Sequence, residues 1–396
     1  MSCAGIIAEY DPFHNGHFLH LRATAQRAPD GVVVVLGGNF TQRGGAALLG
    51  KRYRAEAALR GGADLVLELP LPFALAGAQT FARGGVEVLH ALGCVDMLSF
   101  GSECGNTELL RQAARAVDGE NTQFYIRREL GTGKPYAAAR EAAVRSLYGD
   151  AVADVLHAPN NILGVEYIRA CHTLAPEMQF MTVARRGAAH DAQSPTGAFA
   201  SASFLREQIQ KGETVSSFLP PFSEAILQRA LQNGDAPALI EKLEVAVLAF
   251  LRKCTPQDFQ NTPDISEGLE NRILNAARTA RTLSELFQAT KTKRYSHARI
   301  RRTVLSAFLG VENRHLQGGV PYLRVLGLSE HGKQILHSAR KTARVPVVLR
   351  ASDIGKLSES AQQLFALECA ATDVYALCKP RVGACGSEMT DNVVRF

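Results

Sequence analysis

The sequence predicts an α/β protein in which a parallel sheet is followed by a mainly α-helical domain. In the first two hundred residues, short apolar runs alternate with helical stretches, and after residue 203 this alternation fades. The apolar runs are apolar almost throughout, which is typical of parallel strands covered by helices on both faces. With 396 residues the chain is long enough for two cores, and we expect domains at residues 1–216 and 217–396.

The predicted strands are short, rich in branched apolar side chains and bounded by Gly, Pro or Asp: Ile6–Tyr10, Val32–Gly37, Asp64–Leu69, Asp96–Phe100 and Gln179–Ala184. The predicted helices carry Ala, Leu and Arg at helical spacing: His17–Ala28, Lys51–Leu59, Phe73–Leu92, Tyr136–Leu147 and Ile162–Leu174. Ligands of such sheets bind at the carboxyl ends of the strands. We therefore expect chemistry just after the first, second, fourth and fifth strands.

The second half of the chain has a helical pattern. Pro220-Pro221 interrupts any helix or strand at this point, and we place the domain boundary near Ser216–Phe222. From residue 224 to 289, Leu and Ala recur at helical spacing. One further strand is predicted at Val345–Leu349.

Composition excludes several classes of protein. Hydrophobic residues make up 46% and charged residues 21%, a globular balance, and no apolar run approaches the ~20 residues of a membrane span. No signal peptide is visible after Met1, so we expect a cytoplasmic protein without a membrane partner. The eight cysteines lie far apart without any C-x-x-C pair, and we interpret them as reduced apolar side chains rather than metal ligands.

The first strand runs directly into a candidate phosphate-binding turn, Tyr10-Asp11-Pro12-Phe13-His14-Asn15-Gly16-His17. Gly16 lets the backbone approach a ligand, and the first amides of the following helix form an anion site. His14 and His17 are three residues apart, so both imidazoles project to one side of the first helical turn. Such imidazoles can donate hydrogen bonds to an α-phosphate under attack as pyrophosphate leaves.

Two other interpretations of this histidine pair are a cap with a surface side chain, and a metal site. The position after the first strand of a parallel sheet argues against the first, and no third ligand is evident nearby for the second. His14-Asn15-Gly16-His17 resembles the H-x-G-H signature of the class I synthetase and nucleotidyltransferase superfamily. That superfamily has a Rossmann-like fold that binds ATP and transfers or releases an adenylyl group.

Later segments support this interpretation. Gly101 follows the fourth strand and would let an adenine or ribose lie against the backbone. In Pro159-Asn160-Asn161-Ile162, one Asn caps a helix and the other is left for ligand contact. Ser201, Ser203 and Arg206 resemble the I-S-S-T-x-x-R element that nucleotidyltransferases use at the triphosphate.

Together, segments spread over nearly the whole chain resemble one family, the bacterial tRNA(Met) cytidine acetate ligases. They are 5–17, Gly38-Asn39-Phe40-Thr41-Gln42-Arg43-Gly44, Phe100-Gly101-Ser102-Glu103, 159–164 and Ser266-Glu267-Gly268-Leu269-Glu270-Asn271-Arg272. Two positions depart from the family pattern. Asp11 stands where the family usually has Asn, and Gly45-Ala46 stands where it has an acidic residue followed by Pro.

The resemblance implies an enzyme that uses ATP to activate acetate as acetyl-adenylate and passes the acetyl group to N4 of the wobble cytidine of elongator tRNA(Met). His14 and His17 would be the catalytic residues, and Mg²⁺ would neutralise the leaving pyrophosphate. The ATP contacts implied by position, together with the triphosphate element, are Ile7, Ala8, Glu9, Tyr10, Asp11, Pro12, Phe13, His14, Asn15, Gly16, His17, Phe18, Leu19, His20, Gly101, Asn161, Arg186, Ser203 and Arg206.

A basic segment follows in the second half, where residues 272–302 contain Glu285 as their only acidic residue. Its densest part, interleaved with Tyr295 and His297, is the predicted tRNA-binding surface, Lys291, Lys293, Arg294, Arg299, Arg301 and Arg302. A solvated basic helix is the alternative.

Two other functions stay open from the residues. The first is an adenylyltransferase that forms a dinucleotide cofactor, against which the long basic helical extension argues. The second is a non-catalytic RNA-binding protein on the same scaffold, against which the intact H-N-G-H turn argues.

Overall fold

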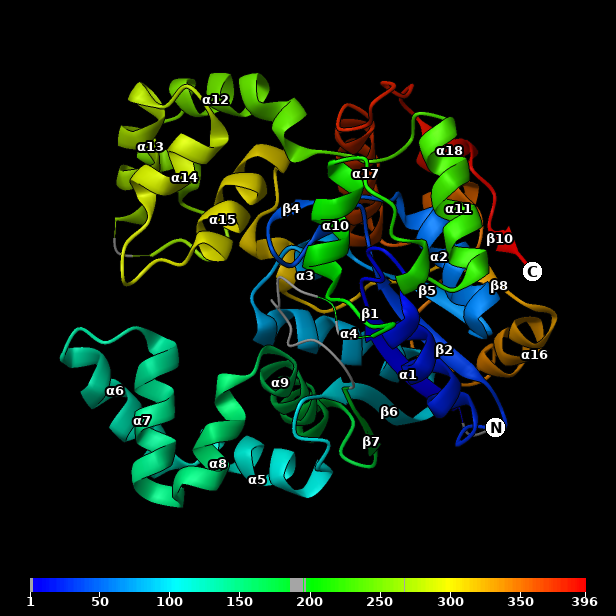
Figure 1. Ribbon diagram of the computed structural model, residues 1–396, viewed down its shortest axis with the longest axis horizontal. Coiled ribbons are helices and arrows are strands. Elements are labelled where there is room, and N and C mark those ends of the chain that lie inside the picture. The colour runs from blue at the N-terminus through cyan, green and yellow to red at the C-terminus, as the bar shows by residue number, and fades with distance from the viewer. Residues whose placement is uncertain (1–2, 186–194, 196, 267) are drawn as a thin grey trace.

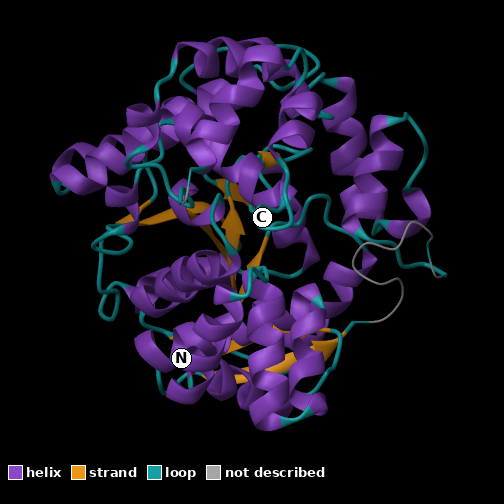
Figure 2. Ribbon diagram, turned by 90° about the vertical axis from the view of Figure 1, so that its left-hand side faces the viewer, coloured by secondary structure: helices purple, strands orange, loops and turns teal. Residues whose placement is uncertain are grey.

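The computed structural model describes residues 3–185, 195, 197–266 and 268–396, and its core is a twisted sheet between helices (Figures 1 and 2). The path of hydrogen-bonded strands is β10-β8-β5-β2-β1-β6-β7, with β9 beside β8. These strands are β1 (Cys3–Ala8), β2 (Val32–Gly37), β5 (Leu65–Leu69), β6 (Val95–Ser102), β7 (Gln179–Ala184), β8 (Leu323–Leu328), β9 (Val347–Val348) and β10 (Val394–Arg395).

The predicted α/β class and its parallel strands are confirmed. From β5 through β2, β1 and β6 to β7 every neighbouring pair is parallel, so their carboxyl ends meet at one edge. The first strand begins and ends earlier than predicted: β1 spans Cys3–Ala8, whereas the predicted strand was Ile6–Tyr10. Tyr10 cannot continue the strand, because its φ is 51°. Leaving the strand at that point turns the next residues across the carboxyl edge of the sheet.

Alternate residues of the central strands pack on opposite helical layers, which is why these strands have no polar face. Ile7 belongs to the core that includes helices α4 (Ala78–Leu92), α5 (Thr107–Asp118) and α9 (Pro159–Leu174). Its neighbour Ile6 belongs to the core formed with α1 (Asn15–Ala25) and α2 (Lys51–Gly61). The predicted helix Phe73–Leu92 is interrupted, because α3 (Leu71–Ala74) ends before Gly77 begins α4.

Two groups of helices extend from the sheet (Figure 1). One contains α6 (Glu120–Gly131), α7 (Tyr136–Tyr148) and α8 (Asp150–Asp154). The other, with a core of its own, contains α12 (Glu244–Lys253), α13 (Leu269–Thr279), α14 (Leu283–Thr290) and α15 (His297–Leu309). Helix α10 (Ala202–Gln210) lies on the side of the sheet that faces this group in Figure 1, and α11 (Pro221–Gln232) packs against α2.

The last part of the chain returns to the sheet, which the sequence did not lead us to expect. Strand β8 pairs antiparallel with β5, and β9 and β10 pair with β8. The remaining helices are α16 (Glu330–Ala339), α17 (Glu359–Ala376) and α18 (Ser387–Thr390). The prediction of a separate mainly helical second domain therefore misses β8 and β10, whereas β9 lies within the strand predicted at Val345–Leu349 and confirms it. The division at residue 216 stays a prediction.

Within the described part of the chain, no helix combines the length and the apolar character needed to cross a bilayer.

Candidate active site

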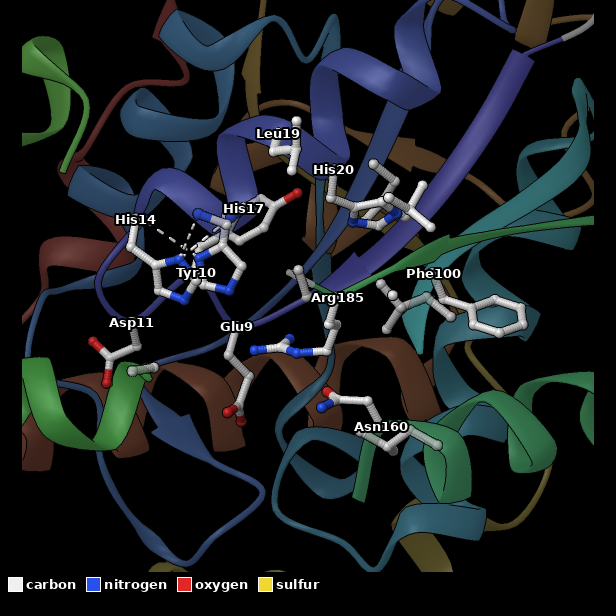
Figure 3. A pocket seen from close by; sticks show the side chains of 18 of the residues that line it. Glu9, Tyr10, Asp11, His14, His17, Leu19, His20, Phe100, Asn160 and Arg185 are labelled. Atoms are coloured by element: carbon white, nitrogen blue, oxygen red, sulfur yellow. Dashed lines mark hydrogen bonds between the residues drawn. The ribbon is translucent and has the colours of Figure 1, made fainter. Parts of the chain in front are cut away.

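The turn between β1 and α1 is held by the two histidines of the H-N-G-H motif. His14 is the N-cap of α1, and its Nδ1 accepts from the backbone amides of Gly16 and His17 at 3.0 and 3.3 Å. In return, Nδ1 of His17 accepts from the backbone amide of His14 at 3.3 Å. The two rings are stacked with centroids 3.6 Å apart (Figure 3).

These hydrogen bonds fix the tautomer of both rings. A neutral imidazole carries one proton, and a nitrogen that accepts a hydrogen bond does not hold it. Because both Nδ1 atoms accept from the backbone, both Nε2 atoms carry the proton and are donors. The capping box of α1 therefore leaves a pair of N–H donors side by side at the end of β1.

Burial keeps these rings neutral. Burial, with the charges of Arg185 and Arg206, lowers the pKa of His14 to about 3. Burial and His14 lower the pKa of His17 well below its usual value. Neither ring is an imidazolium at physiological pH, so each acts as a neutral hydrogen-bond donor.

A third histidine on the same helix is also fixed as a donor. Thr24 donates its hydroxyl proton to the carbonyl of His20 at 2.9 Å, so the Ser99 hydroxyl donates to Thr24 at 2.7 Å. The Ser99 oxygen then accepts from Nε2 of His20 at 2.9 Å. Burial and Arg185 lower the pKa of His20 to about 4.

A cavity of about 210 Å³ opens beside these rings at the carboxyl edge of the sheet. Of the residues predicted to bind ATP, those that line it are Ile7, Ala8, Glu9, Tyr10, Asp11, His14, Gly16, His17, Leu19, His20, Gly101, Ser203 and Arg206. They come from β1, α1, β6 and α10, which are far apart in the sequence. The parallel sheet brings these segments together at the carboxyl ends of its strands, where we expected the ligand to bind.

Other predicted residues lie behind the cavity wall. Pro12 is not among its lining residues, and Phe13 and Phe18 pack against Phe222. Asn15 donates from Nδ2 to the carbonyls of Ala198 and Ser217 at 3.0 and 3.1 Å. These side chains shape the turn and do not face the cavity.

The two asparagines at the start of α9 divide their roles. Oδ1 of Asn161 accepts from the amides of Glu103 and Cys104 at 2.9 and 3.1 Å, which holds the loop after β6. Asn160 lines the cavity and donates to Glu103 at 2.6 Å. Asn160 therefore lines the cavity and Asn161 does not, and the ATP contact of Asn161 stays a prediction.

Arg185, directly after β7, is a cavity residue that the sequence did not single out for ATP. It lines the wall, and burial lowers the pKa of its guanidinium, although Glu103 opposes this shift. The predicted Arg186 lies outside the described residues. Position alone could have identified Arg185, because the first residue after a parallel strand lies at the ligand-binding edge.

Asp11, which stands where the family usually has Asn, has a structural role in this chain. Its two carboxylate oxygens accept from the amides of Leu48 and Leu49 at 3.0 and 3.2 Å. The carbonyl of Asp11 accepts from Arg206 at 2.8 Å. Asp11 thus ties the H-N-G-H turn to the loop before α2 and to α10.

The loop after β2 forms a small hairpin, β3 (Phe40–Thr41) and β4 (Gly45–Ala46), that reaches the cavity. Gln42 and Arg43 at its tip line the cavity, and the Gln42 amide donates to Oε1 of Glu9 at 2.7 Å. The hairpin turns at Gly44, whose φ is 75° and whose added Cβ would lie 2.5 Å from Cβ of Arg301. This side of the cavity is therefore packed directly against α15.

The predicted tRNA-binding residues fall into two groups. Lys291, Lys293, Arg294 and Arg301 are exposed. Arg299 instead donates to the Asp264 carbonyl and to Ser266 Oγ. Arg302 is paired with Asp264 at 3.1 Å and donates to the carbonyl of Gln42 at 3.2 Å. The guanidinium of Arg301 also lies over the ring of Phe287, 5.5 Å from its centroid. The structure thus separates four exposed side chains from two less exposed arginines that hydrogen-bond to the segment around Asp264.

Comparison with known proteins agrees with this geometry. The model of the HIGH Nucleotidyl Transferase family matches residues 1–388. A tRNA(Met) cytidine acetate ligase of Acetivibrio thermocellus is 35% identical over all of both chains. One of Syntrophotalea carbinolica is 39% identical, covering 96% of this chain and 95% of the relative.

Solved structures carry the same fold. Apo TmcAL of Thermotoga maritima superposes with a TM-score of 0.95 at 33% identity, covering both chains completely. The same protein bound with alpha-thio ATP has a TM-score of 0.93 at 33% identity, over 100% of this chain and 99% of that one. This chain therefore belongs to the HIGH nucleotidyl transferase family and, within it, to the family of the tRNA(Met) cytidine acetate ligases.

Proposed function

We propose that this protein is an ATP-dependent ligase that converts acetate to acetyl-adenylate and transfers the acetyl group to N4 of the wobble cytidine of elongator tRNA(Met). The observation that supports this best is the stacked pair of neutral Nε2–H donors in the cavity at the end of β1. We infer acetate and tRNA(Met) as the substrates from the names of the relatives. We place the reaction in the cytoplasm, where tRNA and ATP meet.

In the first half-reaction, an acetate oxygen attacks the α-phosphorus in line and pyrophosphate leaves. The developing charge on the α-phosphate oxygens is stabilised by the Nε2–H groups of His14 and His17. Arg185 and Arg206 add positive charge to the same cavity. Because the donors are fixed before the nucleotide binds, little reorganisation opposes the reaction.

Mg²⁺ supplies charge neutralisation on the triphosphate when it is bound. Among the described residues, no group of three or more His, Cys, Asp or Glu side chains could hold a metal ion. The ion would accordingly rest on the phosphates and water, with at most one or two carboxylates, which is its usual environment.

In the second half-reaction, the cytidine N4 attacks the acetyl carbonyl and AMP leaves. The anticodon base must then be unstacked to reach the cavity. The exposed cations on and before α15, Lys291, Lys293, Arg294 and Arg301, would contact the tRNA phosphates, because α15 lies against the hairpin of the cavity wall.

Incubation with ATP, labelled acetate and bulk tRNA tests the proposal, with elongator tRNA(Met) lacking the wobble cytidine as the control. We expect label on N4 of the wobble cytidine of elongator tRNA(Met) and none on the control RNA. A labelled soluble product without tRNA modification, or RNA binding without any consumption of ATP, would contradict it.

A further inference from the structure

One carboxylate in the cavity has an oxygen that accepts no hydrogen bond from the described residues. Glu9 and Asp11 are the acidic residues among the described lining residues. Both oxygens of Asp11 accept from backbone amides, so its acceptor capacity is used in holding a loop. Glu9 accepts one hydrogen bond, from the Gln42 amide to Oε1, and no described residue donates to its Oε2.

Glu9 is an unfavourable neighbour for a triphosphate but a suitable one for an amine. A carboxylate repels phosphate oxygens in a cavity of low dielectric. It can accept a proton from an N–H group that becomes acidic as it attacks a carbonyl. Figure 3 shows Glu9 beneath the histidine pair, with its carboxylate on the side of Asn160 and Arg185.

The histidines are poor candidates for this proton. In His14 and His17 the Nδ1 atoms accept from the backbone and the Nε2 atoms already hold a proton. His20 donates through Nε2 to Ser99 and has a pKa lowered to about 4, mainly by burial, so it is a weak base.

We propose that Glu9 is the catalytic base of the acetyl-transfer step, accepting a proton from the cytidine N4 through its Oε2. This inference rests on the proposed function. N4 forms a bond to the acetyl carbonyl carbon, and the bond from that carbon to the phosphate oxygen breaks. AMP leaves with the electron pair, and one N4 proton moves to Glu9, which later releases it to water.

The surroundings of Glu9 strengthen its carboxylate as a base. Burial raises the pKa of Glu9, although the Gln42 amide opposes the shift, and Asp11 raises it further while Arg206 and Arg54 lower it. Tyr167 on α9, also close enough to sense this charge, has its own pKa raised by burial. A higher pKa makes the ionised carboxylate a stronger proton acceptor.

The test measures the two half-reactions separately in Glu9→Gln. This variant keeps a carbonyl oxygen for the Gln42 amide, and thus the loop, but removes the base. Acetate-dependent exchange of pyrophosphate into ATP reports activation. Synthetic acetyl-adenylate supplied with elongator tRNA(Met) reports transfer alone. Glu177→Gln, at an exposed site, is the matched control.

In Glu9→Gln we expect the transfer rate to fall by on the order of 10²–10⁴ from its wild-type value. The rate of pyrophosphate exchange should fall far less. The wild-type transfer rate should decline as pH falls through the Glu9 pKa, and this acidic limb should vanish in the variant. Glu9→Asp should keep the acidic limb of the pH profile, with a slower transfer rate than the wild-type protein. The melting temperature, measured in parallel, shows whether each variant is folded.

Three outcomes would overturn the inference. Transfer by Glu9→Gln at the wild-type rate would mean that another group takes the proton. An equal loss in both half-reactions, or an altered Mg²⁺ requirement of the exchange, would make Glu9 a ligand of the nucleotide or its metal. A wild-type protein that performs neither half-reaction would remove the proposed function, and with it this inference.

Discussion

His14 has two roles that different substitutions can separate. Its Nδ1 caps α1, and its Nε2–H faces the cavity. His14→Ala should lower the free energy of unfolding by about 0.5–2 kcal/mol, the usual cost of losing an N-cap side chain. His14→Asn supplies another capping oxygen and should lose little stability. Urea denaturation of the two variants checks this difference.

Both variants should be slow in acetate activation, because neither restores the Nε2–H donor. We expect exchange of pyrophosphate into ATP to fall by on the order of 10²–10³ in His14→Asn, in His14→Ala and in His17→Ala. If His14→Asn kept both stability and activity, the histidine would be only a cap, and the assignment of its Nε2–H would be wrong.

The buried neutral His20 should make the free energy of unfolding depend on pH. Well above pH 6.5 it is neutral in both folded and unfolded chains and contributes no pH dependence. Below that pH the unfolded chain binds a proton that the folded chain does not accept until about pH 4, so stability falls across this window. In His20→Gln the fall in unfolding free energy between pH 6.5 and 4 should be smaller. An unchanged slope would mean that His20 is not buried in the neutral form.

At the scale of elements, the hairpin β3–β4 links the candidate site to α15. The Gln42 peptide is held at its N–H by Glu9 and at its carbonyl by Arg302. Gly44 lets the hairpin turn while it packs on the backbone of Arg302. A substrate contacting α15 would therefore contact an element that is part of the cavity wall.

Arg302→Ala should consequently affect chemistry more than RNA binding. Without the guanidinium, the Gln42 carbonyl and Asp264 lose a shared partner, and the amide held by Glu9 is less fixed. We expect slower acetyl transfer with little change in the affinity for tRNA, and partial rescue by Arg302→Lys. A pure loss of affinity, measured by tRNA titration, would place Arg302 on the RNA-binding surface instead.

The exposed cations should behave in the opposite way. A triple Lys291/Lys293/Arg301→Ala variant should bind tRNA more weakly, with acetate activation intact. The slope of log K against log salt should become shallower by about 0.7–0.9 for each phosphate contact removed. An unchanged slope would make this segment a solvated basic surface.

Sequence patterns predicted the parallel strands better than the site. Apolar runs such as Val32–Gly37 are unambiguous because both of their faces are buried. The choice between Asn160 and Asn161 depends on which amide satisfies the loop after β6, a tertiary contact that local spacing does not encode. The hairpin role of Gly44 likewise depends on the neighbouring α15.

At the scale of the whole molecule, a buried ionic cluster joins the end of the chain to the sheet. Lys51 on α2 contacts Glu68 of β5 at 2.5 Å and Glu388 of α18 at 2.6 Å. Thr372 on α17 donates to Glu388 at 2.8 Å. Burial alone would lower the pKa of Lys51, but the carboxylates outweigh it and raise the pKa. The second half of the chain is therefore fastened to the catalytic sheet by charge as well as by β8.

Removing the cation from this cluster should be costly. Lys51→Met leaves carboxylates buried without their partner, and we expect a loss of about 3–5 kcal/mol in the free energy of unfolding. Lys333→Met, which breaks an exposed pair with Glu330, should cost less than about 1 kcal/mol. Similar urea midpoints for the two variants would show that the cluster does not fasten the two halves.

The return of β8 to the sheet could not be read from local pattern. Leu323–Leu328 is short, contains Arg324, and lies in a region otherwise rich in helices. It becomes a strand because β5 offers an open edge and Arg324 is buried against Phe365. Both reasons are tertiary.

We propose that acetate is activated by adenylation at the histidine pair before its transfer to tRNA. The most direct measurement follows AMP, pyrophosphate and N4-acetylcytidine in one reaction with acetate, ATP and elongator tRNA(Met). We expect one AMP and one pyrophosphate for each acetyl group transferred, inhibition by added pyrophosphate, and no modification when acetyl-CoA replaces acetate and ATP. Release of ADP, or modification from acetyl-CoA without ATP, would contradict it.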